Sequence, residues 1–259
     1  MKRSGLLLYG VLVLLFLCLP TLLVVPMSFS GTSYLQFPPP SWSLQWHRGF
    51  LDSEEWMAAT VVSLKVALAN VAVSLLVGGA AAYGLYTSGF ARRKLLFGLL
   101  MTPIVFPVIL LAIGSFYLYA QLGLLNSLLG LILSHASLSI PIVLIFVTAA
   151  LRSYDFNQER AARSLGASRL LAFATITLPQ IRLSLLSAGL FAFLTSFDEV
   201  VISIFISGGQ STTLTKRMFN SLRDIMDPTV AAISTWLIVL TCLLLIAAQF
   251  LGRPEGRDD

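Results

Sequence analysis

The sequence predicts an all-α integral membrane protein with six transmembrane helices. Of its 259 residues, 57% are hydrophobic and only 11% are charged, whereas a soluble domain carries about a quarter charged residues. A soluble globule of this length has too little interior for so many apolar side chains, but a protein that faces lipid does not need to bury them. Six segments are also long and apolar enough to cross roughly 30 Å of hydrocarbon. These observations exclude a soluble enzyme, a disordered tail and a secreted disulfide scaffold.

We treat residues 1–259 as one transmembrane domain. Its six predicted spans are residues 5–27, 62–86, 96–120, 127–150, 183–206 and 228–251. The first span could be mistaken for a signal peptide. We interpret it as retained, because its apolar run is too long and no small-residue cleavage site follows it. Pro103, Pro107 and Pro141 interrupt the third and fourth spans, where proline commonly kinks membrane helices.

Basic residues are distributed unequally between the two sides that the spans define. One side has 12 Lys and Arg residues, which lie near the N-terminus, at 92–94, in 151–182 and after the last span. The other side has four Lys and Arg residues, and Lys65 lies near the end of the second span that faces this side. Because Lys and Arg are enriched on the cytoplasmic side, we expect both termini in the cytoplasm. The pI of about 9.5 therefore reflects membrane orientation, and we expect no nucleic-acid partner.

The polar loop 152–180, between the fourth and fifth spans, is too regular in pattern for a slack linker. It predicts a short helix over Phe156–Leu165, which Gly166 ends by adopting the left-handed conformation. It predicts a second short helix over Ser168–Thr177, which Ser168 caps and Pro179 ends. The pattern therefore indicates a compact helix–turn–helix at the cytoplasmic surface, where a partner can apply force to the chain.

The same loop resembles the EAA loop of importer-type ABC transporter permeases. The residues that carry the resemblance are Ala161, Ala162, Gly166, Ala167, Ile176, Leu178 and Pro179. The resemblance implies the type I ABC importer permease (MetI-like) fold. It also implies that the first helix of the loop is a coupling helix, seated in a groove of a separate ABC ATPase.

One position of the loop departs from the family pattern. The pattern has a glutamate six residues before the glycine, where this chain has Arg160, and Glu159 lies one position earlier. Adjacent helix residues point about 100° apart. The resemblance leaves two alternatives: Glu159 reaches a basic partner on the ATPase, or Arg160 pairs with an acidic one.

Two adjacent carboxylates, Asp198 and Glu199, are predicted to lie deep in the fifth span. Ionisable residues at such depth are costly and usually face a partner or a watery pathway. Thr195 lies on the same side of the predicted helix, and Phe197 is adjacent in sequence. Carboxylates beside aromatic rings suit an ammonium substrate, because charge and cation–π attraction act together. The alternative is a buried pair with Lys65 or with a second permease.

Segments 197–202, 213–214 and 227–235 resemble the spermidine/putrescine-type branch of these permeases, and the likeness extends along nearly the whole chain. The subunit resembled is the second of two non-identical permeases. The resemblance implies a bacterial inner-membrane importer with a second homologous permease, two copies of an ABC ATPase and a periplasmic substrate-binding protein. Related permeases also carry aminophosphonates, amino acid derivatives or ferric iron, so these cargoes remain alternatives.

The chain has no nucleotide-binding or catalytic motif of its own. The patterns G-x-x-x-x-G-K-[ST], H-E-x-x-H and G-x-S-x-G do not occur, and His47 and His135 are isolated. We therefore expect no enzymatic activity, metal or cofactor in this chain, with ATP and Mg²⁺ bound by the partner ATPase. A rival is an ion-coupled secondary transporter, which needs inverted repeats or broken helices that the sequence does not reveal. An integral-membrane enzyme is a weaker rival.

Overall fold

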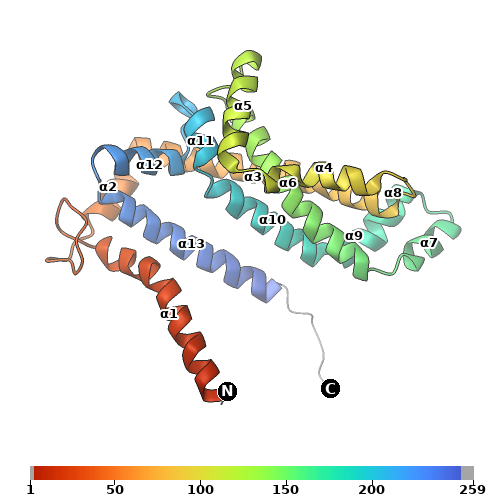
Figure 1. The fold of residues 1–259 in the computed structure, drawn as a ribbon, viewed down its shortest axis with the longest axis horizontal. Helices are drawn as coiled ribbons and strands as arrows, with labels where there is room; N and C mark the ends of the chain where they lie inside the picture. Colours follow the sequence, from red (N-terminus) through yellow and green to blue (C-terminus); the bar gives the residue numbers. More distant parts are fainter. Residues whose placement is uncertain (1–2, 252–259) are drawn as a thin grey trace. The chain divides into compact units, whose positions relative to one another are not determined.

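The computed structural model describes residues 3–251, and this part of the chain is almost entirely helical (Figure 1). Over the same residues, the only extended pairing is one isolated bridge between Ser30 and Trp42. The predicted all-α class is therefore confirmed. Three basic residues that were used to orient the chain, Lys2, Arg253 and Arg257, lie outside the described part.

The described chain forms two compact units. One consists of the chain up to Ala58 together with Arg217–Leu243, and the other consists of Ala59–Lys216 together with the chain from Leu244 onward. The first unit contains α1 (Arg3–Met27), α2 (Gln45–Asp52) and the first part of α13 (Thr229–Leu251). The large apolar side chains of α1 between Leu6 and Leu22 are exposed, as expected of a helix that faces lipid.

The imidazole of His47 is a packing group in the first unit. Its ring centroid lies 4.7 Å from that of Phe29 and 6.3 Å from that of Trp236. Its Nε2 lies 3.2 Å from the hydroxyl of Ser28, and burial lowers the pKa of the imidazole. These contacts fasten α2 to the end of α1 and to α13.

The second unit contains most of the helices. They are α3 (Glu54–Thr87, from Ala59 on), α4 (Arg93–Val105), α5 (Val108–Leu122), α6 (Leu128–Ser153), α7 (Asn157–Ser164), α8 (Arg169–Ala172), the π-helical turn η1 (Phe173–Thr177), α9 (Leu178–Gln180), α10 (Arg182–Phe197), α11 (Val201–Ile206), the 3₁₀ turn η2 (Gly209–Ser211) and the start of α12 (Leu214–Asp224). At its centre α6 packs against α10 and α4, and α11 packs against α5 and α6. Small residues such as Ala188 and Ala192 on α10 are fully buried in this core, which allows the helices to approach closely.

Among the described helices, α1, α3, α6 and α13 are long and apolar enough to cross a membrane. The number rises to as many as six if each of two bent helix pairs forms one span. These six regions overlap the ranges expected from the sequence, and α3 begins at Glu54, earlier than its predicted start at residue 62.

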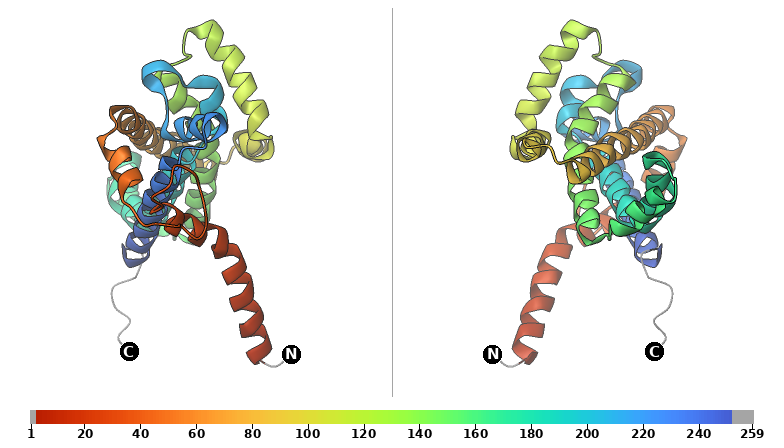
Figure 2. Two further views of the ribbon diagram at one scale, coloured as in Figure 1. Left: turned by 90° about the vertical axis from the view of Figure 1, so that its left-hand side faces the viewer. Right: turned by 90° about the vertical axis from the view of Figure 1, so that its right-hand side faces the viewer.

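The span expected over 96–120, with proline interruptions, consists of two helices. α4 ends at Val105 and α5 begins at Val108, and the two helices meet at 100° (Figure 2). Pro107 has no amide to continue the ladder, and it restricts Phe106 to an extended conformation with φ −79° and ψ 144°. A proline that was expected to kink the span therefore divides it into two helices.

The prediction of one continuous helix over 183–206 is wrong. α10 ends at Phe197 and α11 begins at Val201, so three residues separate the two helices. Asp198 and Glu199 lie in this helix break, which we define as Asp198–Val200. The charged residues that marked the span as unusual therefore coincide with the place where the helix stops.

Candidate coupling loop and helix break

Two predicted turn residues organise the loop between α6 and α10. Gly166 follows α7 with φ +97°, the left-handed conformation expected of it. The hydroxyl of Ser168 accepts a hydrogen bond from the amide of Leu171 and caps α8. The first loop helix, α7, is slightly shorter than predicted. The first helix, the turn and the capped start of the second helix are therefore present as expected from the sequence.

The prediction that Pro179 ends the second loop helix is wrong. From α8 the helix continues through η1 and α9 and bends by 77° at Ile181, where α10 begins. In η1 the amide of Leu178 donates to the carbonyl of Phe173, five residues back. Just before Pro179 the backbone hydrogen bonds change from the α-helical pattern, four residues back, to the π-helical pattern, five residues back. The missing amide of Pro179 therefore does not stop the helix.

Glu159 of α7 is directed into the chain. Its carboxylate accepts hydrogen bonds from the hydroxyl of Tyr83 on α3 at 2.6 Å and from that of Thr177 in η1 at 2.7 Å. Only 4% of the residue is exposed. Glu159 therefore links three segments of this chain and does not extend toward a partner, which corrects the first alternative drawn from the family pattern.

A second link joins the loop to the end of α3. The guanidinium of Arg169 donates to the hydroxyl of Thr87 at 2.6 Å and lies 5.4 Å from the centroid of the Tyr83 ring. Sequence reasoning missed Tyr83, Thr87 and Arg169. Their hydrogen bonds cross 76 and 82 residues of chain, and no local spacing signals them.

The outer surface of the loop is basic and apolar. Leu165 is 90% exposed and Leu170 is 77% exposed, and the Arg160 and Arg163 side chains also face solvent. Of the other predicted loop residues, Ala161, Gly166, Leu178 and Pro179 are exposed, whereas Ala162, Ala167 and Ile176 are half-buried. The loop thus has an inner face held by Glu159 and an outer face without cover in this chain.

The side chain of Glu199 caps α11. One of its carboxylate oxygens accepts hydrogen bonds from the backbone amides of Ile202 at 2.8 Å and Ser203 at 3.2 Å. The first amides of a helix have no intrahelical partner, so a carboxylate at this position stabilises the start of α11. Glu199 is buried and Asp198 is exposed, so the two do not share one helix face as predicted.

A buried polar group of α6 approaches the capping carboxylate. Nδ1 of His135 lies 2.8 Å from the hydroxyl of Ser196 on α10, and its Nε2 lies 4.0 Å from Glu199. That Nε2 has no hydrogen-bond partner within residues 3–251. The predicted alternative that paired the carboxylates with Lys65 is wrong, because the Lys65 side chain is exposed and Glu199 is held by α11 and faces His135.

A cation closes the other end of α11. Nζ of Lys216 donates to the carbonyls of Ile204 and Ser207, and burial lowers the pKa of this ammonium. The hydroxyl of Thr215 donates to the carbonyl of Glu199 at 2.9 Å. An anion at the N-terminal end and a cation at the C-terminal end both complement the helix dipole, so this short helix is held at both ends.

The helix break leaves one carboxylate available to a ligand. Asp198 is exposed, and Phe197 and Thr195 beside it are half-buried. An exposed carboxylate next to an aromatic ring attracts cations. Within the described residues, no group of three or more His, Cys, Asp and Glu side chains is arranged to hold a metal ion.

Several apolar helices of membrane-spanning length, with a helical loop between two of them, are the features of a multi-pass membrane protein. Residues 74–253 match the family described as binding-protein-dependent transport system inner membrane component, and the chain belongs to this family. It is similar to the spermidine/putrescine transport system permease protein PotC of Haemophilus influenzae, with 28% identity over 242 residues that cover 93% of each chain. It is also 31% identical to the putrescine transport system permease protein PotI of Escherichia coli K12, over 93% of this chain and 88% of that one.

Solved structures give the same fold. A bacterial ABC transporter involved in the import of the acidic polysaccharide alginate contains a chain that matches with a TM-score of 0.74 and 17% identity, over 98% of this chain and 99% of that one. The MetNI methionine ABC transporter matches with a TM-score of 0.60 and 16% identity, over 77% of this chain and 97% of that one. The predicted fold of a type I, MetI-like ABC importer permease is therefore confirmed.

Proposed function

We propose that this chain is the transmembrane permease subunit of an ATP-driven importer whose cargo is spermidine, putrescine or a related small amine. The observation that carries the proposal is the similarity to two polyamine permeases over about nine-tenths of the chain. The exposed Asp198 carboxylate beside Phe197 supports the same cargo class, because both groups attract ammonium ions.

The importer would contain a second homologous permease, two copies of an ABC ATPase and a periplasmic substrate-binding protein. A related fold occurs in the structure of a bacterial alginate ABC transporter in complex with a pentasaccharide-bound periplasmic protein, which supports the last of these partners. ATP and Mg²⁺ would be bound by the ATPase, and this chain would perform no chemistry. The excess of Lys and Arg on one side supports an orientation with both termini and the loop in the cytoplasm.

The outer face of the loop is the proposed contact with the ATPase. Leu165 and Leu170 offer apolar anchors, and Arg160 offers a charge for an acidic partner. A displacement of α7 would pull on Tyr83 and Thr177 through the Glu159 carboxylate. Because Tyr83 lies on α3 and η1 leads into α10, this link would pass motion from the ATPase to two membrane helices.

The helix break is the proposed lining of the cargo pathway. Asp198 would attract the cationic cargo, with Phe197 and Thr195 beside it. Glu199, named with them in the sequence prediction, would act indirectly, because its carboxylate is occupied by the amides of α11. This division assigns electrostatic attraction to the exposed acid and positioning of the helix break to the buried one.

Isolation of the tagged chain from native membranes in mild detergent, with mass spectrometry of the accompanying proteins, tests the class. We expect an ABC ATPase and a second permease. A chain that comes out alone under several detergents would contradict the proposal and favour an ion-coupled secondary transporter. Such transporters use broken helices. The chain has helix breaks that the sequence did not reveal, but its family is that of binding-protein-dependent transport.

Uptake of radiolabelled putrescine and spermidine by cells that have or lack this chain tests the cargo. We expect uptake to depend on the chain and to fall at least about tenfold in Asp198→Asn, as for the loss of a charged contact. Normal uptake by Asp198→Asn would remove Asp198 from the pathway. If neither amine is transported, the assay passes to aminophosphonates, amino acid derivatives and ferric iron.

A further inference from the structure

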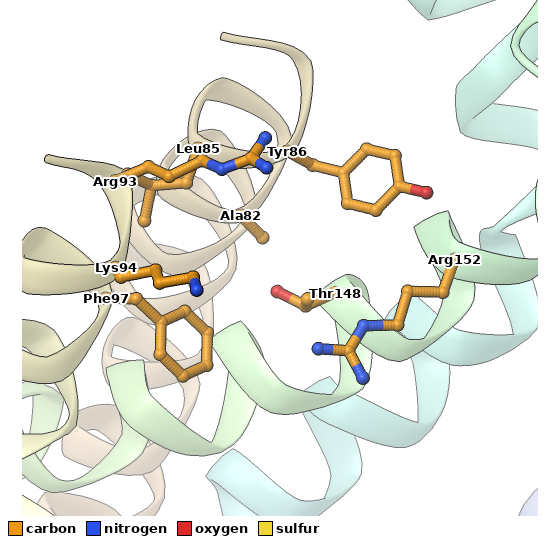
Figure 3. A pocket seen from close by; sticks show the side chains of 8 residues that line it. All are labelled: Ala82, Leu85, Tyr86, Arg93, Lys94, Phe97, Thr148 and Arg152. Atoms are coloured by element: carbon orange, nitrogen blue, oxygen red, sulfur yellow. The ribbon is translucent and has the colours of Figure 1, made fainter. Parts of the chain in front are cut away.

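A cavity of about 570 Å³ lies between the ends of α3, α4 and α6 (Figure 3). Three cationic side chains line it: Arg93 and Lys94 at the start of α4, and Arg152 at the end of α6. Figure 3 shows the ammonium of Lys94 and the guanidinium of Arg152 on opposite sides of the Thr148 hydroxyl. Three positive charges thus share one cavity with a hydroxyl group.

Nothing in the described chain neutralises these charges. Within residues 3–251, neither an ion pair nor a side-chain hydrogen bond joins Arg93, Lys94 or Arg152 to another residue. The start of α4 adds to the positive field, because its N-cap residue Arg92 makes no side-chain cap and its first turn contains no acidic residue. Cations that converge on a hollow beside an uncapped helix N-terminus favour an anion with several oxygen acceptors.

The apolar residues of the cavity wall indicate that the bound anion is part of an amphiphilic molecule. Phe97, Leu85 and Ala82 line the cavity, and the side chains of Leu95 and Leu99 next to it on α4 are exposed. A free inorganic anion would use the cations alone. A phospholipid would use both parts, with its phosphate among the cations and its acyl chains along the exposed face of α4.

We propose that this cavity binds the phosphate headgroup of an anionic phospholipid at the membrane surface. The site lies beside the loop, because the ring of Tyr86, which lines the cavity, stacks on Phe156 at 5.2 Å, directly before α7. A bound headgroup would therefore stabilise the stacked Tyr86 and Phe156 rings, which support the loop where α7 begins. Only the assignment to the cytoplasmic leaflet rests on the proposed function, because it uses the proposed orientation.

The test is a lipid titration of the purified full-length protein with its co-purifying subunits, followed by native mass spectrometry. After delipidation, dioleoylphosphatidylglycerol is compared with zwitterionic dioleoylphosphatidylcholine. We expect selective binding of phosphatidylglycerol, weakened about fivefold by Lys94→Gln or Arg152→Gln, since a basic residue near an anionic lipid surface contributes about 1 kcal/mol. Arg92→Gln is the matched control, because it removes a neighbouring charge that does not line the cavity and should leave this selectivity intact.

Thr148→Val keeps the size and charge of the site and should weaken phosphatidylglycerol binding to a smaller extent. This variant keeps the proposal testable if a glutamine variant fails to fold. Equal binding of the two lipids, or an equal loss in Arg92→Gln, would overturn the proposal. Displacement of the lipid by millimolar inorganic phosphate would also overturn it, in favour of a free-anion site. The readout involves neither cargo nor ATP, so failure of the proposed transport function would not produce any of these results.

Discussion

Two glutamates are buried in the same helical unit, and the structure uses them in different ways. Glu159 accepts hydrogen bonds from the side-chain hydroxyls of Tyr83 and Thr177, which lie 76 and 18 residues away in sequence. Glu199 accepts hydrogen bonds from backbone amides three and four residues ahead of it. The first carboxylate joins separate segments of the chain, and the second shapes a local break in one helix.

The difference separates contacts that transmit movement from contacts that maintain a shape. A bond between two segments responds whenever one segment moves relative to the other. A helix cap changes only when the helix itself unfolds. Loss of the Glu199 cap should therefore reduce stability and transport together, whereas loss of the Glu159 link should reduce stability and also uncouple ATPase activity from transport.

The largest effect is expected for Glu199→Ala. The substitution leaves two buried amides of α11 without acceptors, and each unsatisfied buried group costs roughly 1–3 kcal/mol. We expect the free energy of unfolding to fall by about 3 kcal/mol, measured by denaturation of the purified protein in detergent. Glu199→Gln keeps an acceptor oxygen, so its free energy of unfolding should fall by less. Asp198 is adjacent but exposed, and Asp198→Ala should change the free energy of unfolding by less than about 0.5 kcal/mol. Unchanged stability of Glu199→Ala would contradict the capping role.

The next effect is expected for Glu159→Gln. Hydrogen bonds to a charged acceptor contribute roughly 1.5–3 kcal/mol, and we expect a loss of about 2 kcal/mol in the free energy of unfolding. A double-mutant cycle with Tyr83→Phe measures the link directly, because two residues that share a bond give non-additive losses. Arg160→Gln is the control on the outer face and should leave stability unchanged. Strict additivity of Glu159→Gln and Tyr83→Phe would show that the link contributes nothing.

The expected cost of Gly166→Val is comparable to that of Glu159→Gln but smaller. The left-handed conformation at Gly166 costs a residue with a Cβ atom roughly 1–2 kcal/mol, so the turn between α7 and α8 should shift. We expect uptake to fall while the ATPase activity of the purified complex persists. Gly84→Ala, at a helical position with open space around the glycine, should keep both activities. Full transport by Gly166→Val would count against the coupling role of the loop.

The smallest effect is expected for Lys216→Met. A cation at a helix C-terminus contributes about 0.3–1 kcal/mol, and the substitution keeps much of the apolar stem. We expect a loss of this size in the free energy of unfolding, and Lys216→Arg should restore most of it. A loss as large as that of Glu199→Ala would mean that both ends of α11 contribute equally to its stability.

The positions of the helices could be predicted from the sequence more fully than their continuity. Apolar length alone locates α1, α6 and α13 within a few residues, because crossing a membrane depends on composition. The break at Phe106–Pro107 was visible only as a kink, since the angle depends on how α5 packs against α11. The separation of Asp198 from Glu199 was not visible, because helical periodicity assumes a continuous helix.

The candidate loop was predictable in outline and not in its contacts. Gly166 and Ser168 act locally, so their residue types were sufficient to predict the turn and the cap. The inward direction of Glu159 depends on Tyr83 and Thr177, and that of His135 depends on Ser196 on another helix. Such pairings arise from tertiary packing, and a single sequence contains no spacing that signals them.

The π-helical turn η1 has a consequence for changes in chain length. A π-helical turn contains one residue more than the α-helical turn it replaces. Deletion of one residue within Phe173–Thr177 would restore a regular α-helix and leave the faces of α9 and the start of α10 in phase. Deletion within α10 itself would rotate every later residue of that helix by about 100°. The turn is therefore the point where this helix can lose a residue without changing which side chains face its neighbours.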